Sequence, residues 1–120
     1  MTRVMLKSKI FYANVTEAQL YYKGSITIDE EILEAADLME HERVDVLNVN
    51  NGARIQTYAI KGKRGSGVIC LNGPAARSGA IGDRIVIVSY GLYSADELSR
   101  YKVNFVELGA KNEITNTYLG

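Results

Sequence analysis

The chain has 120 residues, the length of one compact domain, and its 14 basic residues balance 14 acidic ones. Its composition, 47% hydrophobic and 23% charged, is typical of a folded globular protein and excludes a disordered or fibrous one. Because no net positive charge would attract nucleic acid or an anionic membrane surface, we expect neither as a partner.

Compartment signals come from the N-terminus and from cysteine usage. Charges interrupt every apolar run in residues 2–9, so no signal-peptide core is predicted there, and nothing approaches a membrane span. The single Cys70 excludes an intramolecular disulfide framework and suits a reducing compartment. We therefore expect a cytoplasmic protein.

Short strands dominate the predicted secondary structure. In chain order the pattern predicts a strand at 25–28, a helix at 29–39, a hairpin of strands 44–49 and 53–60 closed by Asn50-Asn51-Gly52, strands at 68–71 and 84–90, a helix at 94–101 and a strand at 103–108. Many short strands with two short helices favour a closed or nearly closed β-barrel, because closure satisfies hydrogen bonds at the sheet edges. The predicted fold class is therefore mainly β, in one domain of residues 1–120.

Three features that could suggest a site have simpler explanations. Residues 60–67 contain glycines and cations but lack the Gly-Lys-Ser/Thr ending of a phosphate loop, so a flexible, solvated hairpin loop is expected. His41 has no partner at metal-ligand spacing, so we place it at the surface and predict no metal site. Cys70 lies in an apolar strand without a neighbouring His and is expected to be a small core residue.

The pair Gly24-Ser25 precedes a strand and by itself predicts only a turn. Three further motifs accompany it in order: Met5-Leu-x-x-Lys9-Ile10, Asn51-Gly52-x-Arg54-x-x-Thr57-Tyr58-Ala59-Ile60 and Asn72-Gly73-x-Ala75-Ala76. Together, from Met5 to about Leu108, they resemble the aspartate 1-decarboxylase family.

The resemblance implies a double-psi β-barrel, a homotetramer and a precursor that cuts itself between Gly24 and Ser25. The products are a β-chain of residues 1–24 and an α-chain of residues 25–120, in which Ser25 has become a covalent pyruvoyl group. This group replaces pyridoxal phosphate, and no metal is implied. The implied reaction converts the substrate L-aspartate to β-alanine and CO₂, a step of pantothenate biosynthesis.

The resemblance also implies roles for individual residues in maturation and catalysis. The Ser25 hydroxyl attacks the carbonyl of Gly24, whose missing Cβ leaves the backbone free to adopt the required geometry. Thr57 donates a hydroxyl to the resulting oxyanion and also lines the substrate site. Tyr58 returns a proton to the α-carbon after CO₂ leaves.

Substrate binding requires cations, because aspartate brings two carboxylates into a cleft. Lys9 and Arg54 are the candidates that the resemblance implies. Motif position alone assigns a further group of residues to this site: Tyr22, Asn72, Gly73, Pro74 and Ala75.

Strand alternation places Arg54 and Tyr58 on one side of their strand and Thr57 on the other. A pocket lined by all three requires either a bulge or a site built where subunits meet. We favour the subunit boundary, because an oligomer is expected.

Two positions depart from the family pattern. Phe11 stands where a His is common, so any part that imidazole takes in maturation cannot operate, and the need for a maturation factor is open. Pro74 has no backbone N–H, which leaves the amides of Gly73, Ala75 and Ala76 as donors.

The alternatives to an active decarboxylase are a non-enzymatic β-barrel regulator or adaptor, and a family member that stays an uncleaved precursor.

Overall fold

Nine strands and three short helices make up the computed structural model, which describes residues 1–120. The strands are β1 (Thr2–Asn14), β2 (Glu17–Gln19), β3 (Ser25–Asp29), β4 (Arg43–Asn48), β5 (Arg54–Gly62), β6 (Ile69–Asn72), β7 (Arg84–Ser94), β8 (Asn104–Leu108) and β9 (Ile114–Leu119). The helices are α1 (Glu30–Ala35), the 3-10 helix η1 (Gly73–Ser78) and α2 (Ala95–Leu98). The predicted mainly β fold class is confirmed.

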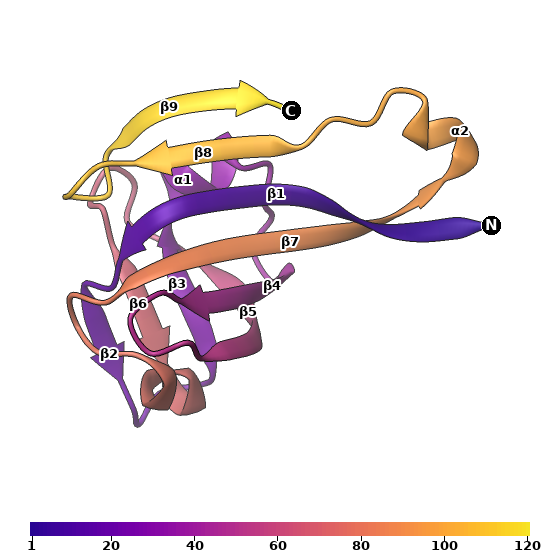
Figure 1. Ribbon diagram of the computed structural model, residues 1–120. Helices are drawn as coiled ribbons and strands as arrows, with labels where there is room; N and C mark the ends of the chain where they lie inside the picture. Colours follow the sequence, from indigo (N-terminus) through magenta and orange to yellow (C-terminus); the bar gives the residue numbers. More distant parts are fainter.

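All strands belong to one sheet, in the order β2-β6-β3-β5-β4-β7-β1-β8-β9. The pairs β1–β8, β2–β6 and β3–β5 are parallel and the other neighbours are antiparallel, so the sheet is mixed. The long strands β1 and β7 run side by side across the molecule (Figure 1). A single mixed sheet of this kind is consistent with the predicted small β-barrel.

One hydrophobic core is shared by strands from widely separated places in the sheet order. Ile10 on β1, Ile28 on β3 and Ile87 on β7 are at most 1% exposed and belong to one cluster of 18 buried residues. Ile32 and Leu33 add the inner face of α1 to the same cluster. Because side chains from separated strands meet, the sheet curls around this core.

The predicted hairpin is confirmed as β4 and β5, with the turn at residues 50–52. The Asn48 side chain accepts hydrogen bonds from the backbone N–H groups of Asn50 and Asn51, at 2.8 and 3.3 Å. Gly52 then takes a φ of +75°, which reverses the chain at little steric cost.

Both predicted helices are shorter in the structure than expected. Asp29 caps α1 through the N–H of Glu31 at 2.8 Å, and two residues after the helix Asp37 adopts a φ of +55°. In α2 the caps are Ser94 and Glu97, which bond each other's backbone in a capping box. The left-handed Asp37 therefore ends α1, whereas the capping box fixes only where α2 begins.

Four elements were not predicted: β1, β2, β9 and η1. The first half of β1 pairs with the end of β7 as an exposed ribbon that projects beyond the core (Figure 1), and β9 is also largely exposed. An exposed strand needs no alternation of apolar residues, so its pattern gives no signal. For η1 the signal was Pro74, which suits the first turn of a helix.

Buried polar side chains attach two loops to the barrel. Asn112, 3% exposed, bonds both backbone groups of Asn14 and the carbonyl of Gly67, at 2.8–2.9 Å. The Asp29 carboxylate accepts from the N–H groups of Gly65 and Gly67 at 3.0 and 2.8 Å. The 60–67 loop is largely exposed as expected, but the prediction of a hairpin is wrong, because β3 lies between β5 and β6 in the sheet, and the glycine backbone of the loop is held in place. No helix in the structure is long and apolar enough to cross a bilayer.

Candidate active site

A cavity of about 390 Å³ opens where β3 begins, between β5 and η1. Its lining residues are Gly24, Ile55, Gln56, Thr57, Tyr58, Pro74, Ala75 and Ser78. Five of these eight are residues that the sequence assigned to the site. Two cavities of about 450 and 440 Å³ lie elsewhere, and neither is lined by any predicted site residue.

The strand register explains why consecutive residues of β5 line this cavity. The parallel pairing of β3 with β5 begins at Ile26 and Ala59. Residues 55–58 of β5 therefore run past the start of β3, and their edge on that side has no strand partner. Extending the register places Gly24 beside Thr57. Both faces of β5 border the same space there, so Thr57 and Tyr58 line it together, and the β4–β5 pairing contains no bulge.

Ser25 lies directly behind the cavity wall as the first residue of β3, and its side chain is fully buried. Asn72 is its antiparallel partner on β6. The Asn72 Nδ2 donates to Ser25 Oγ at 2.9 Å. Asn72 therefore contacts the predicted nucleophile and does not line the cavity itself.

Gly73 explains why the turn after β6 can lie against the Gly24–Ser25 bond. Its φ is +62°, and a Cβ there would be 2.5 Å from the Tyr22 carbonyl oxygen and 2.9 Å from the Gly24 Cα. Only glycine allows this approach. Pro74 follows, and its Cδ would lie 3.4 Å from a Cβ at Gly24, which is ordinary contact.

We expect Gly73→Ala to lower the free energy of unfolding much more than Gly52→Ala. Both glycines have a left-handed φ, which costs a Cβ-bearing residue about 1 kcal/mol. Nothing lies within 4 Å of a Cβ at Gly52, whereas one at Gly73 would overlap backbone and add about 1–3 kcal/mol. Urea unfolding followed by circular dichroism measures both variants. Equal losses would contradict the close packing of Gly73.

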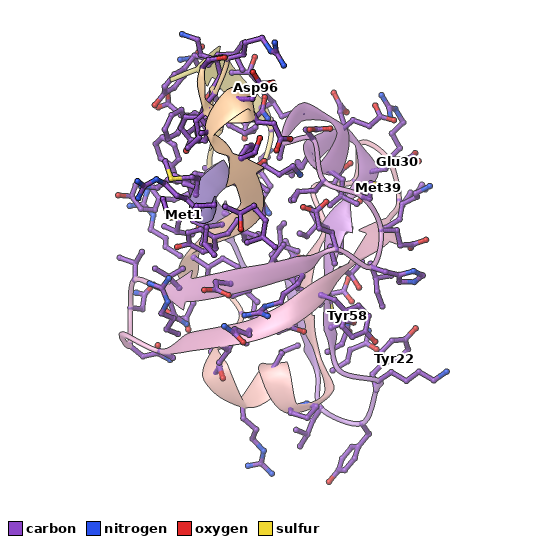
Figure 2. The ribbon with its side chains drawn as sticks, turned by 90° about the vertical axis from the view of Figure 1, so that its right-hand side faces the viewer. Met1, Tyr22, Glu30, Met39, Tyr58 and Asp96 are labelled. Atoms are coloured by element: carbon purple, nitrogen blue, oxygen red, sulfur yellow. The ribbon has the colours of Figure 1, made fainter.

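The two tyrosines assigned to the site lie on the same side of the molecule (Figure 2). Tyr58 is 36% exposed, and its ring is 6.2 Å from that of His41, measured between centroids. His41 is exposed, as predicted, but its contact with Tyr58 was not foreseen. Tyr22 is 53% exposed, and its backbone carbonyl packs against Gly73.

The two predicted carboxylate-binding cations do not line the cavity of the single chain. The Arg54 Nη2 lies 3.2 Å from the Tyr90 hydroxyl and 3.3 Å from the Asp45 carboxylate. The hydrogen bonds that the guanidinium donates to Tyr90 and, to a smaller extent, to Asp45 raise the pKa of Arg54. The Lys9 ammonium lies 5.2 Å from the centroid of the Phe11 ring. Both cations are therefore held by other partners.

Sequence reasoning did not identify every polar residue of the cavity. Gln56 precedes Thr57 within the quoted motif, so its position was an available signal. Ser78 lies at the end of η1 and offered none. No group of three or more His, Cys, Asp or Glu side chains is arranged to hold a metal ion.

This fold and cavity define a small mainly β protein of β-barrel type with a candidate catalytic site. Over residues 1–115 the chain matches the family described as aspartate decarboxylase. It is 54% identical to the aspartate 1-decarboxylase of Pelotomaculum thermopropionicum over 97% of this chain and 88% of that protein. It is 57% identical to that of Wolinella succinogenes, over 92% and 91% respectively. The chain belongs to the aspartate decarboxylase family.

Proposed function

We propose that this protein is an enzyme that decarboxylates L-aspartate to β-alanine and CO₂, after cutting its own chain between Gly24 and Ser25. The family match and the named relatives support the reaction. The observation that carries the proposal is that the Gly24–Ser25 bond borders the cavity lined by Thr57 and Tyr58. A Gly-Ser pair in an ordinary surface turn would have no such surroundings.

Maturation begins when Ser25 Oγ attacks the Gly24 carbonyl carbon. The C–N bond breaks as the C–O bond forms, and the proton lost by the hydroxyl ends on the freed amine, giving an ester. Loss of the Ser25 α-proton then breaks the Cβ–Oγ bond and releases the carboxylate of Gly24. The remaining dehydroalanine tautomerises, and water replaces its nitrogen as ammonia, leaving a pyruvoyl group.

Three residues support the first step in this proposal. Gly24 lacks a Cβ and allows the backbone to reach an attack geometry. Thr57, beside Gly24 by extension of the β3–β5 register, donates its hydroxyl to the carbonyl oxygen as negative charge develops there. Asn72 holds the Ser25 hydroxyl at 2.9 Å.

The surroundings of Ser25 fit a pyruvoyl group, because Ser25 is enclosed on β3 while the neighbouring bond faces the cavity. Such a group supplies a carbonyl that draws electrons from the carbon losing CO₂. Tyr58, exposed at the cavity, returns the proton to that carbon. The chain then needs neither a metal nor pyridoxal phosphate.

We further propose that Lys9 and Arg54 bind the substrate carboxylates in a homotetramer, where subunits complete each other's sites. The exposed β1–β7 ribbon supports an assembly, because Val4, Tyr90 and Leu92 are 68%, 43% and 68% exposed in the single chain. A substrate carboxylate must compete with Asp45 for Arg54. A cytoplasmic location stays a prediction.

Intact-mass analysis of the purified protein tests the proposal. We expect two fragments, residues 1–24 and residues 25–120, with only the larger one reacting with a hydrazide label. Addition of L-aspartate should then release CO₂. One unlabelled chain of full length without CO₂ release would point to an uncleaved precursor if a maturation factor restores both, and to a non-enzymatic adaptor if none does. Full turnover by an unbroken chain would refute the proposed mechanism.

A further inference from the structure

Four polar side chains form a compact group on one face of the β3–β6 strand pair. Ser25 and Thr27 are two residues apart on β3 and so share a face. The antiparallel register sets them directly opposite Asn72 and Cys70 on β6. We call Ser25, Thr27, Cys70 and Asn72 the cross-strand quartet. Only Ser25 and Asn72 were assigned to the site from the sequence.

The Asn72 amide is the centre of this quartet. Its Nδ2 donates to Ser25 Oγ at 2.9 Å and to Thr27 Oγ1 at 2.8 Å. The Cys70 Sγ donates to Asn72 Oδ1 at 3.2 Å. Asn72 is 2% exposed and Cys70 is 3% exposed, so water does not satisfy these atoms. Every polar atom of the amide therefore depends on a quartet partner.

These partners select one of the two orientations of the amide. In the observed orientation, both Nδ2 hydrogens meet hydroxyl oxygens and Oδ1 meets a thiol hydrogen. Reversal would direct Nδ2 at sulfur, a weak acceptor. Burial raises the pKa of the Cys70 thiol, which keeps its hydrogen in place for donation.

We propose that Thr27 and Cys70 are positioning residues for self-cleavage, because they hold the Asn72 amide so that it donates to Ser25 Oγ. This inference rests on the proposed function. A donated hydrogen bond leaves the Ser25 proton free to depart and stabilises the negative charge that grows on Oγ as the O–H bond breaks. In the reversed orientation, Asn72 Oδ1 would accept a hydrogen bond from the Ser25 hydroxyl, and this bond would hold the Ser25 proton in place.

The first test compares side chains of matched shape at the two positions. Thr27→Val keeps the branched shape without the hydroxyl, and Cys70→Ala removes the thiol. We expect Thr27→Val to slow cleavage about three- to tenfold, the worth of one buried hydrogen bond, and Cys70→Ala to slow it about two- to threefold, because a thiol is a weak donor. Thr27→Ser and Cys70→Ser keep a donor or acceptor and should cleave within about twofold of the unaltered chain. Cell-free synthesis with a radioactive pulse and gel analysis of the chase gives the rate.

Thr115→Val is the matched control, because this exposed β9 threonine bonds only the Glu107 carbonyl, at 3.2 Å. Its cleavage rate should be unchanged. If the unaltered chain never cleaves, the proposed function fails and this inference fails with it. If the unaltered chain cleaves, and both Thr27→Val and Cys70→Ala cleave as fast as it does, this inference alone is overturned.

A double-mutant cycle separates positioning from general structural support. If Thr27 acts only through Asn72, Thr27→Val should not slow cleavage further in an Asn72→Ala background. An undiminished effect there would overturn the inference. A readout independent of cleavage uses the Ser25→Ala chain, in which Thr27→Val should accelerate hydrogen exchange of the Asn72 side-chain amide by NMR. Unchanged exchange would also overturn it.

Discussion

Ser25→Ala is expected to yield a single chain of residues 1–120 that has no detectable decarboxylase activity. Alanine has no hydroxyl to attack the Gly24 carbonyl, so neither the break nor the ketone can form. Because enzymes typically accelerate their reactions by about 10⁶-fold or more, loss of the reactive group should reduce turnover to background. Intact-mass analysis and CO₂ release from L-aspartate measure the two effects on the same sample.

The chain contains its own control for this experiment. Gly65-Ser66 is a second Gly-Ser pair, in an exposed loop where the Ser66 hydroxyl bonds the Lys63 carbonyl. Ser66→Ala should be cleaved and active like the unaltered protein. Circular dichroism should show that Ser25→Ala folds, because Asn72 keeps Thr27 as an acceptor. Turnover by folded Ser25→Ala would mean that the cofactor does not come from this serine.

Tyr58→Phe is expected to mature normally and then turn over about 10²- to 10⁴-fold more slowly, the usual contribution of a positioned proton donor. The phenyl ring keeps the contact with His41, and only the hydroxyl of this cavity-lining residue is lost. Maturation should be spared because the proposed donor in that step is Thr57. Initial rates of CO₂ release at saturating aspartate, with cleavage checked by mass, separate the two stages.

Tyr118→Phe is the matched control for this substitution. Tyr118 stacks on Phe105 with centroids 4.9 Å apart, and phenylalanine preserves that stacking. Its turnover should not change. Full-speed turnover by cleaved Tyr58→Phe would remove Tyr58 from the role of proton donor and leave the self-cleavage proposal intact.

The sequence alone determined the fold class, the hairpin and the family. The hairpin was predictable because Asn50-Asn51-Gly52 is a strong local turn signal between two alternating strands. The family was recognisable because motifs around Gly24-Ser25, Thr57-Tyr58 and Asn72-Gly73 keep their order and spacing. These signals are local or depend on residue identity, so they need no knowledge of which strands pair.

Only the tertiary structure decided which of the motif residues meet. Alternation along a strand defines two faces but does not name the neighbouring strand, so neither the Ser25–Asn72 contact nor the place of Gly24 beside Thr57 could be predicted. The same limit hid the partners of Arg54, which depend on the pairing of β4 with β5 and β7. Cys70 was correctly predicted to be buried, but the contacts of its neighbour Asn72 with Ser25 and Thr27 follow from the β3–β6 register. Pairing between residues distant in the chain is a property of the folded sheet, which no periodicity in the sequence encodes.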